Sequence, residues 1–189
     1  MNMIKKIALM SIWFVSGLAF AHPGHHHHDA SFWTGFIHPF TGLDHLMMAL
    51  SFGVLMWSMS KIWKMIGAWG LLTALVAGFS LGAHGIIPTG VAEIGIVGSL
   101  FILAVSLWTK SNGVFPIAAV LLSVFHGSAH GAELAMNGNV GVQILGMITA
   151  MAMIYALGLG LGALMVKFVP QGKKIVGVLA ALVAVIGLA

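Results

Sequence analysis

Long apolar stretches dominate this chain and restrict what it can fold into. Of its 189 residues, 60% are hydrophobic and only 6% are charged, whereas a soluble domain has about 25% charged residues. So few charges cannot solvate the surface of a globular protein of this size. We therefore expect an all-α, polytopic transmembrane protein whose first partner is the lipid bilayer.

Residues 1–21 are typical of a cleaved secretory signal peptide. A basic start is followed by an apolar stretch over residues 7–20, and Ala-Phe-Ala at its end fits the cleavage rule. The alternative is an uncleaved first transmembrane helix. After cleavage, residues 22–35 form a histidine-rich extracytoplasmic tail, in which His22 and His25 are candidate accessory metal ligands. Four consecutive histidines resemble an expression tag, but their position behind a cleavage site favours a native segment.

Six apolar segments in residues 36–189 predict a domain of six transmembrane helices. A helix needs about 20 apolar residues to cross the hydrocarbon core, and the last segment is short for a full span. Gly-x-x-x-Gly spacings in three of the segments predict close helix packing. The segments cover residues 36–59, 65–87, 91–108, 114–135, 140–166 and 175–189.

The lysines of the mature chain occur only in alternate connections between these segments. The connections at residues 88–90 and 137–141 have none. The positive-inside rule makes the lysine-containing connections cytoplasmic, so both termini should lie outside the bacterial inner membrane. The net charge of +4 comes without a basic patch, and we expect no binding to nucleic acid. The lysines concerned are Lys61, Lys64, Lys110, Lys167, Lys173 and Lys174.

The first and fourth segments carry ionisable side chains, which are costly at membrane depth and mark sites or pathways. In the fourth segment the spacing is i, i+4, i+7, which places three such groups on one helix face. With the orientation above, all of them lie in the outer half of the bilayer. The candidate metal ligands are His38, Asp44, His45, His126, His130 and Glu133, and the accessory candidates include His84 and Glu93.

The geometry of the first segment depends on whether its helix is regular. On a regular helix His38 and His45 share a face, and Asp44 points about 120° away. His45 would then lie about 12–14 Å below the outer entrance of the segment. Pro39 and Gly42 make a regular helix doubtful, and a break there would turn Asp44 inward.

Imidazoles and carboxylates bind nickel, cobalt, zinc or iron(II). The chain has no cysteine, which removes thiolate ligands. A proton relay is the main functional alternative for the same groups, and a structural hydrogen bond is the expected role of a lone His84. The 13 methionines suggest copper, but methionine is a common filler of apolar gaps, so we expect Met47 and Met48 to pack.

Two motifs carry a family resemblance, together with the Ala21-His22-Pro23-Gly24-His25 start. They are His38-Pro39 with Gly42 and Asp44-His45, and Phe125-His126-Gly127 with His130-Gly131 and Glu133. This pattern resembles the HupE/UreJ family of hydrogenase and urease accessory membrane proteins. The resemblance implies a nickel permease, with cobalt as a second substrate, rather than an enzyme. It also implies that the six candidate ligands are the functional residues.

The mechanism we expect starts with capture of a divalent cation by the tail. His38 with Glu133 passes the ion inward, and Asp44, His45, His126 and His130 then hold it near the midplane. No phosphate-binding loop is evident, so transport would be passive or ion-coupled. A metal-binding accessory protein or a metalloenzyme would use the same residues, and a proton-coupled carrier of an organic solute is a third alternative. A homo-oligomer also remains open.

Overall fold

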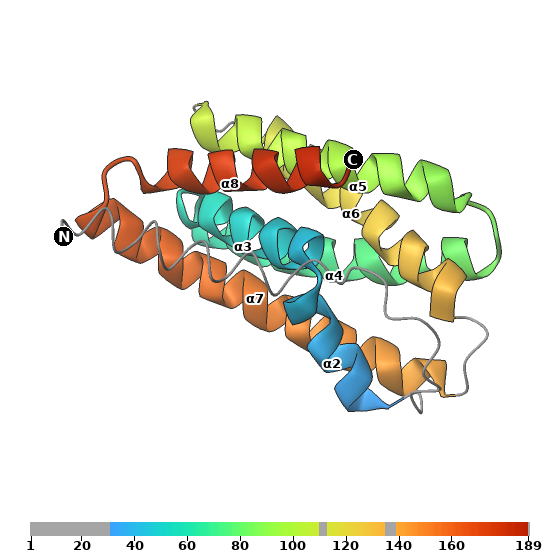
Figure 1. The fold of residues 1–189 in the computed structure, drawn as a ribbon. Helices are drawn as coiled ribbons and strands as arrows, with labels where there is room; N and C mark the ends of the chain where they lie inside the picture. Colours follow the sequence, from blue (N-terminus) through green and yellow to red (C-terminus); the bar gives the residue numbers. More distant parts are fainter. Residues whose placement is uncertain (1–30, 110–112, 135–138, 189) are drawn as a thin grey trace, which may run out of the picture.

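The computed structural model describes residues 31–109, 113–134 and 139–188, and the regular secondary structure of this part of the chain is all α-helical (Figure 1). The predicted signal peptide, most of the tail with His22 and His25, and Lys110 lie outside the described residues. The helices are α2 (Phe32–Thr41), α3 (Leu43–Trp57), α4 (Lys61–Ala83), α5 (Thr89–Trp108), α6 (Val114–Leu134), α7 (Val140–Phe168) and α8 (Gly172–Ile186).

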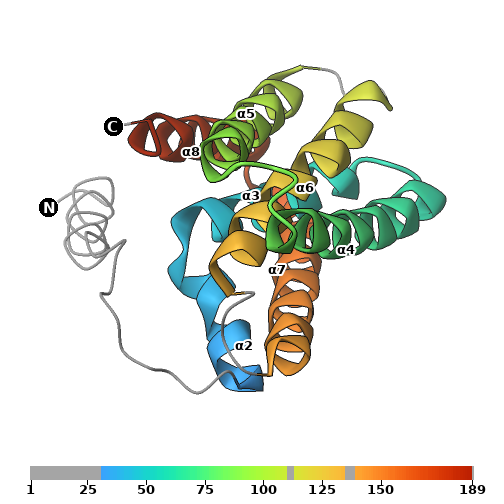
Figure 2. The same cartoon turned by 90° about the vertical axis from the view of Figure 1, so that its right-hand side faces the viewer.

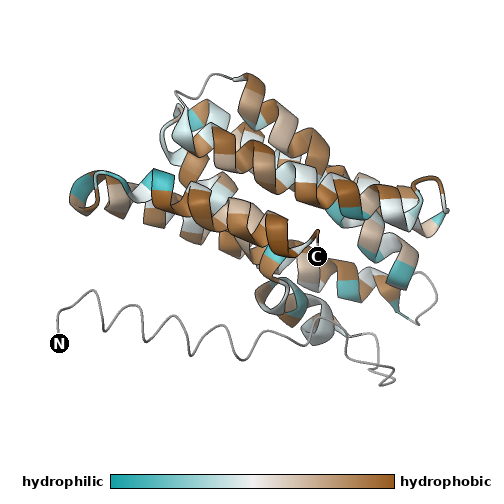
Figure 3. Ribbon diagram, turned by 45° about the horizontal axis from the view of Figure 1, so that its top comes forward, coloured by the Kyte–Doolittle hydropathy of each residue, from teal (hydrophilic) through white to brown (hydrophobic). Residues whose placement is uncertain are grey.

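Four of these helices, α4 to α7, are long and apolar enough to cross a membrane. The pair α2 and α3 counts as a fifth span only if it is taken together, since the two helices are bent by 78°. Hydrophobic residues cover much of the outer surface of the bundle (Figure 3). The chain is therefore a multi-pass membrane protein.

The predicted count of six spans is not confirmed. The first predicted segment is two helices in the structure, separated at Gly42. The last segment forms α8, which has 15 residues and is shorter than the about 20 residues that a full crossing needs.

Helix α3 lies at the centre of the bundle (Figure 2). Nearly all of its residues from His45 to Met56 are buried, and Phe52 and Leu55 are among the largest fully buried side chains. A helix in this position is shielded from lipid by its neighbours. Polar groups near its start can therefore face protein.

Glycines hold α4 and α6 at backbone contact. A Cβ atom on Gly78 would overlap the backbone carbonyl of Val124. Gly82, Gly127 and Gly131 meet the backbone of the facing helix in the same way. The two four-residue glycine spacings predicted to pack thus interlock with one another, and they leave no room for a side chain in this interface.

Helix α7 runs along both halves of the bent pair and fixes their positions. Gly53 of α3 and Gly158 of α7 meet backbone to backbone, and Gly146 of α7 lies against the carbonyl of Phe32 in α2. In contrast, Gly160 of α7 has open space beside it. The glycine contacts with α2 and α3 are therefore specific to one side of α7.

One end of the bundle gathers the lysines, and we call it the lysine end. The Lys173 ammonium contacts the hydroxyl of Ser58, directly after α3. The indole of Trp108, the last residue of α5, donates to the carbonyl of Lys174 at 3.1 Å. Lys64 lies 4.0 Å above the ring of Trp57. The described lysines thus lie together, as their alternation along the chain predicts.

Candidate metal centre

The break between α2 and α3 creates the centre of the site. Gly42 has an extended backbone, with φ −81° and ψ 112°. Its N–H donates to the carbonyl of His38 at 3.0 Å, and its own carbonyl accepts from Leu46 at 3.0 Å. Gly42 therefore ends one helix and begins the next. The break that Pro39 and Gly42 predicted is present, with Pro39 buried within α2.

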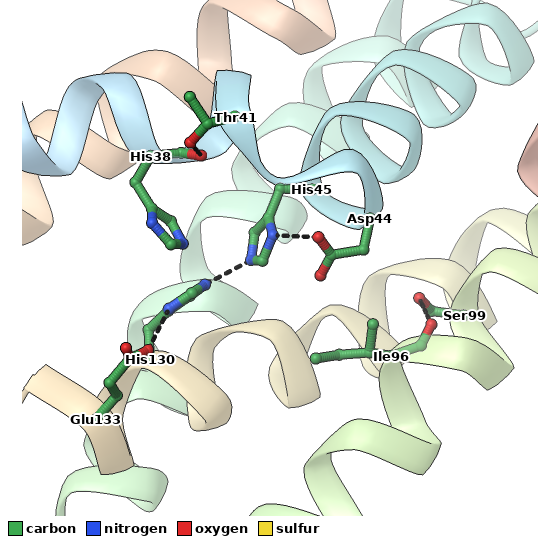
Figure 4. A network of polar contacts seen from close by, with 8 residues as sticks. All are labelled: His38, Thr41, Asp44, His45, Ile96, Ser99, His130 and Glu133. Carbon is green, nitrogen blue, oxygen red and sulfur yellow. Dashed lines mark hydrogen bonds and ion pairs between the residues drawn. The ribbon is translucent and has the colours of Figure 1, made fainter. Parts of the chain in front are cut away.

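The bend brings two histidines together that a straight helix would separate. Seven residues rise about 10.5 Å along a regular helix, but the ring centroids of His38 and His45 are 5.5 Å apart. The two rings are therefore closer together than the rise of a regular helix between the two residues. Because the chain turns by 78° between them, both rings point to the same place beside His130 (Figure 4).

Three imidazoles from three helices converge at this point. His45 Nε2 and His130 Nε2 are 2.5 Å apart, and the rings of His38 and His130 have centroids 4.5 Å apart. One nitrogen from each of the three rings lies within 4.8 Å of the others. His45 and His130 are buried, and His38 is partly buried. We call these residues the three-histidine cluster.

The cluster fits a divalent ion after small side-chain movements. Two nitrogens bound to one ion at about 2.1 Å each are at most about 4.2 Å apart, and about 3.4 Å in a tetrahedron. Nitrogens of the cluster that are as far apart as 4.8 Å must therefore move slightly closer to bind one ion. The His45 and His130 nitrogens are at hydrogen-bond distance, 2.5 Å, so these two rings would have to move apart to admit a cation between them.

Carboxylates lie on the far sides of two of these rings. Asp44 Oδ1 is 2.9 Å from His45 Nδ1, and Glu133 Oε2 is 3.9 Å from His130 Nδ1. Metal-bound histidines commonly use the second ring nitrogen to contact a carboxylate, which fixes the orientation of the ring. The geometry therefore puts Asp44 and Glu133 behind the imidazoles (Figure 4), whereas the sequence placed both among the ligands.

Gly42 has a second role that sequence reasoning missed. A Cβ atom at this position would lie 3.0 Å from His45 Nδ1 and 3.1 Å from Asp44 Oδ1. These distances are tighter than ordinary contacts, so a side chain at residue 42 would press on the Asp44–His45 pair. The signal in the sequence was a glycine directly before Leu43, Asp44 and His45.

His126 lies beside the cluster and is not one of its three members. Its ring packs edge-on against His45, with centroids 5.0 Å apart and an interplanar angle of 89°. Four residues separate it from His130, about 6 Å along α6, and this rise carries it past the three converging nitrogens. The sequence had grouped His126 with His45 and His130 in one site.

The remaining accessory candidates lie apart from the cluster. His84 is exposed at the end of α4, and its Nδ1 is 2.7 Å from the carbonyl of Ser80. This contact is local to the end of α4, whereas the structural role expected for a lone His84 was a hydrogen bond between helices. Glu93 is exposed on α5. Neither residue belongs to the group of converging nitrogens found in the described residues.

Comparison with known proteins agrees with the two motifs around this site. The HupE / UreJ protein family matches residues 9–189. This chain belongs to the HupE/UreJ family. Protein HupE of Rhizobium leguminosarum bv. viciae is 31% identical over 199 aligned positions, which cover 100% of this chain and 98% of the relative. No solved structure matches the chain.

Membership confirms the resemblance drawn from the polar motifs. HupE/UreJ proteins are accessory membrane proteins, and they are not enzymes. The metalloenzyme alternative is therefore removed. The two motifs that carry the resemblance supply the three-histidine cluster, which lies between α2, α3 and α6.

Proposed function

We propose that this protein is a permease that takes a divalent transition metal inward across the bacterial inner membrane. Nickel is the main substrate, and cobalt and zinc are secondary ones. His38, His45 and His130 hold the ion, and Asp44 and Glu133 orient two of the rings. The observation that carries the proposal is the convergence of three imidazole nitrogens within 4.8 Å, inside a helix bundle.

The chemistry of the cluster supports a borderline metal. Neutral imidazoles suit nickel, cobalt and zinc, whereas Mg²⁺ and Ca²⁺ prefer oxygen ligands. The absence of cysteine excludes thiolate binding of softer metals. Three nitrogens also leave coordination positions open, so the ion can enter and leave without dismantling the site.

The ion enters from the end of the bundle opposite the lysines. Glu133 is 72% exposed at the side chain and lies behind His130, so it attracts cations to the cluster. The histidine-rich tail, with His22 and His25, gathers the ion before this step. The lysine end faces the cytoplasm, the signal peptide is cleaved after residue 21, and both mature termini lie outside.

Uptake by proteoliposomes tests the proposal. Purified protein is reconstituted, and the accumulation of radioactive nickel is compared for wild type, His45→Ala and His130→Ala. Thr149→Ala is the matched control, because Thr149 is exposed and bonds only within its own helix. We expect uptake by wild type and the control, and a loss in both histidine variants. Undiminished nickel uptake in both His45→Ala and His130→Ala would contradict the permease proposal.

A second candidate is a membrane protein that holds metal for delivery without transporting it. One observation favours it: the three-histidine cluster is the only group of converging histidine and carboxylate ligands among the described residues. A protein of this kind binds nickel at equilibrium, but its proteoliposomes accumulate no more nickel than empty vesicles. The same uptake experiment therefore separates the two candidates.

A further inference from the structure

His126 is a buried imidazole outside the three-histidine cluster. It is fully buried, and neither of its ring nitrogens has a hydrogen-bond partner among the described residues. Buried polar groups are almost always paired, because an unpaired one has lost its water without replacement. An imidazole with both nitrogens in this state is adapted to a partner that is not part of the protein.

On α3 and on α6, a buried side chain follows the histidines one helical turn nearer the lysine end. On α3, Met48 follows His45 by three residues, and on α6, Ser123 precedes His126 by three residues. Each step is about 4.5 Å along its helix. Because α3 and α6 run in opposite directions, both steps lead the same way, towards the lysine end.

These two side chains, Met48 and Ser123, are in contact with each other. Ser123 Oγ lies 3.7 Å from Met48 Sδ, and both side chains are buried. The Ser123 hydroxyl donates to the carbonyl of Ala119 at 2.8 Å, so its oxygen lone pairs remain available inside the bundle. His126 lies on α6 between this pair and the cluster: its ring centroid is 5.0 Å from that of His45, and it follows Ser123 by three residues, which puts both on one side of the helix.

We propose that His126, Met48 Sδ and Ser123 Oγ form a second, inner station for the transported cation, which receives the ion from His45. This inference rests on the proposed permease function. It gives Met48 a ligand role, where the sequence suggested packing alone. One imidazole, one thioether and one hydroxyl bind nickel or cobalt more weakly than three imidazoles do. A weaker inner station suits conduction, because an ion that binds too tightly does not leave.

The inner station makes a prediction that the cluster alone does not make. Its loss should slow transfer while leaving capture by the cluster intact. Equilibrium nickel binding in detergent reports on the cluster, and nickel uptake by proteoliposomes reports on the whole path. The variants are His126→Leu and Met48→Leu. The Met48→Leu substitution keeps the volume and removes the sulfur.

Two controls isolate the chemistry from packing. Met47→Leu removes the sulfur of the neighbouring methionine, and Ser128→Ala removes a different buried hydroxyl of α6. Both should bind and transport nickel as wild type does. His126→Gln, which keeps a polar side chain of similar size, provides a second variant if His126→Leu does not fold.

We expect His126→Leu and His126→Gln to keep wild-type nickel affinity and to lose about tenfold or more in uptake, the range in which single supporting groups of metal sites act. Met48→Leu should show a smaller loss of uptake with unchanged affinity. Wild-type uptake in the His126 variants and in Met48→Leu would overturn the inner station. A parallel loss of affinity and uptake would also overturn it, because His126 would then belong to the cluster. If wild type binds nickel without accumulating it, the permease proposal itself has failed, and this result is distinct from the other two.

Discussion

Helix α6 has two neighbouring faces: a glycine face that packs against the backbone of α4, and a histidine face that turns towards α3. Gly127 and Gly131 press against the backbone of α4, with no space for even a methyl group. The preceding residues, His126 and His130, turn towards His45 on α3. The glycine face is filled by backbone contacts, whereas on the histidine face both ring nitrogens of His126 have no hydrogen-bond partner within the described part of the chain.

This difference shows how a site for a mobile ion can be built in a membrane. In lipid, helices associate by close packing and not by the hydrophobic effect, and small residues allow that packing. The glycine face fixes the height and rotation of α6. The histidine face can then hold imidazoles at a set position without using their nitrogens for structure. Substitutions on the two faces should therefore separate stability from metal binding.

The largest effect is expected on the glycine face. Gly127→Leu would drive a side chain into the backbone of Leu75, which cannot move aside as a flexible side chain can. The cost should reach or exceed the upper end of the about 1–3 kcal/mol typical of overpacking. Thermal unfolding in detergent measures it, and nickel binding should fall as well, because α6 is displaced.

Gly160→Leu is the control for this prediction. Gly160 lies on α7 with open space around it, so the same substitution should leave the unfolding temperature close to that of wild type. Equal destabilisation at residues 127 and 160 would mean that the glycine contacts do not set the position of α6.

The second effect is confined to the histidine face. His130→Gln keeps a polar side chain of similar volume but removes one of the three converging imidazoles. Loss of an outer carboxylate typically costs 10–100-fold in metal affinity, so loss of a ligand should cost more than about 100-fold. Equilibrium dialysis with radioactive nickel measures the affinity. The unfolding temperature without metal should change far less than in Gly127→Leu, and the opposite order would break the comparison.

The sequence predicts the two faces of α6 better than it predicts the site itself. Spacings of four residues place Gly127 with Gly131 and His126 with His130, because helix periodicity alone decides these pairs. The grouping of the loop lysines at one end follows from the alternation of the helices in the same way. These are local rules, and the structure agrees with them.

The arrangement of the histidines was not predicted, because it depends on the angle between α2 and α3. Pro39 and Gly42 indicate a break, but the bend of 78° depends on packing against α7, and no local pattern encodes it. That bend brings His38 to His45. The sequence also cannot separate a ligand from a carboxylate behind a ligand, because the two differ by a few ångströms in the folded chain. This is why Asp44 was grouped with the histidines.

Asp44→Asn tests whether Asp44 orients His45 or binds the ion itself. Asparagine keeps the size and a hydrogen-bonding oxygen but removes the charge that faces His45 Nδ1 at 2.9 Å. If Asp44 orients His45, nickel affinity should fall by about 10–100-fold, less than in His130→Gln. A loss as large as that of His130→Gln in the same dialysis experiment would return Asp44 to the ligands. Thr41→Ala is the control, since the Thr41 hydroxyl bonds only to the carbonyl of His38.

The smallest effect is expected for Glu133→Gln. Its carboxylate lies behind His130 as Asp44 lies behind His45, but at 3.9 Å and with 72% of the side chain exposed. Water screens an exposed charge, so its influence on the ring should be weak. Nickel affinity should fall only a few-fold, whereas the rate of uptake at low nickel concentration should fall more, and added salt should reduce the difference from wild type. A drop in affinity as large as that of Asp44→Asn would mean that Glu133 closes onto His130 when the ion binds, and that both carboxylates act as equal partners of the histidine face.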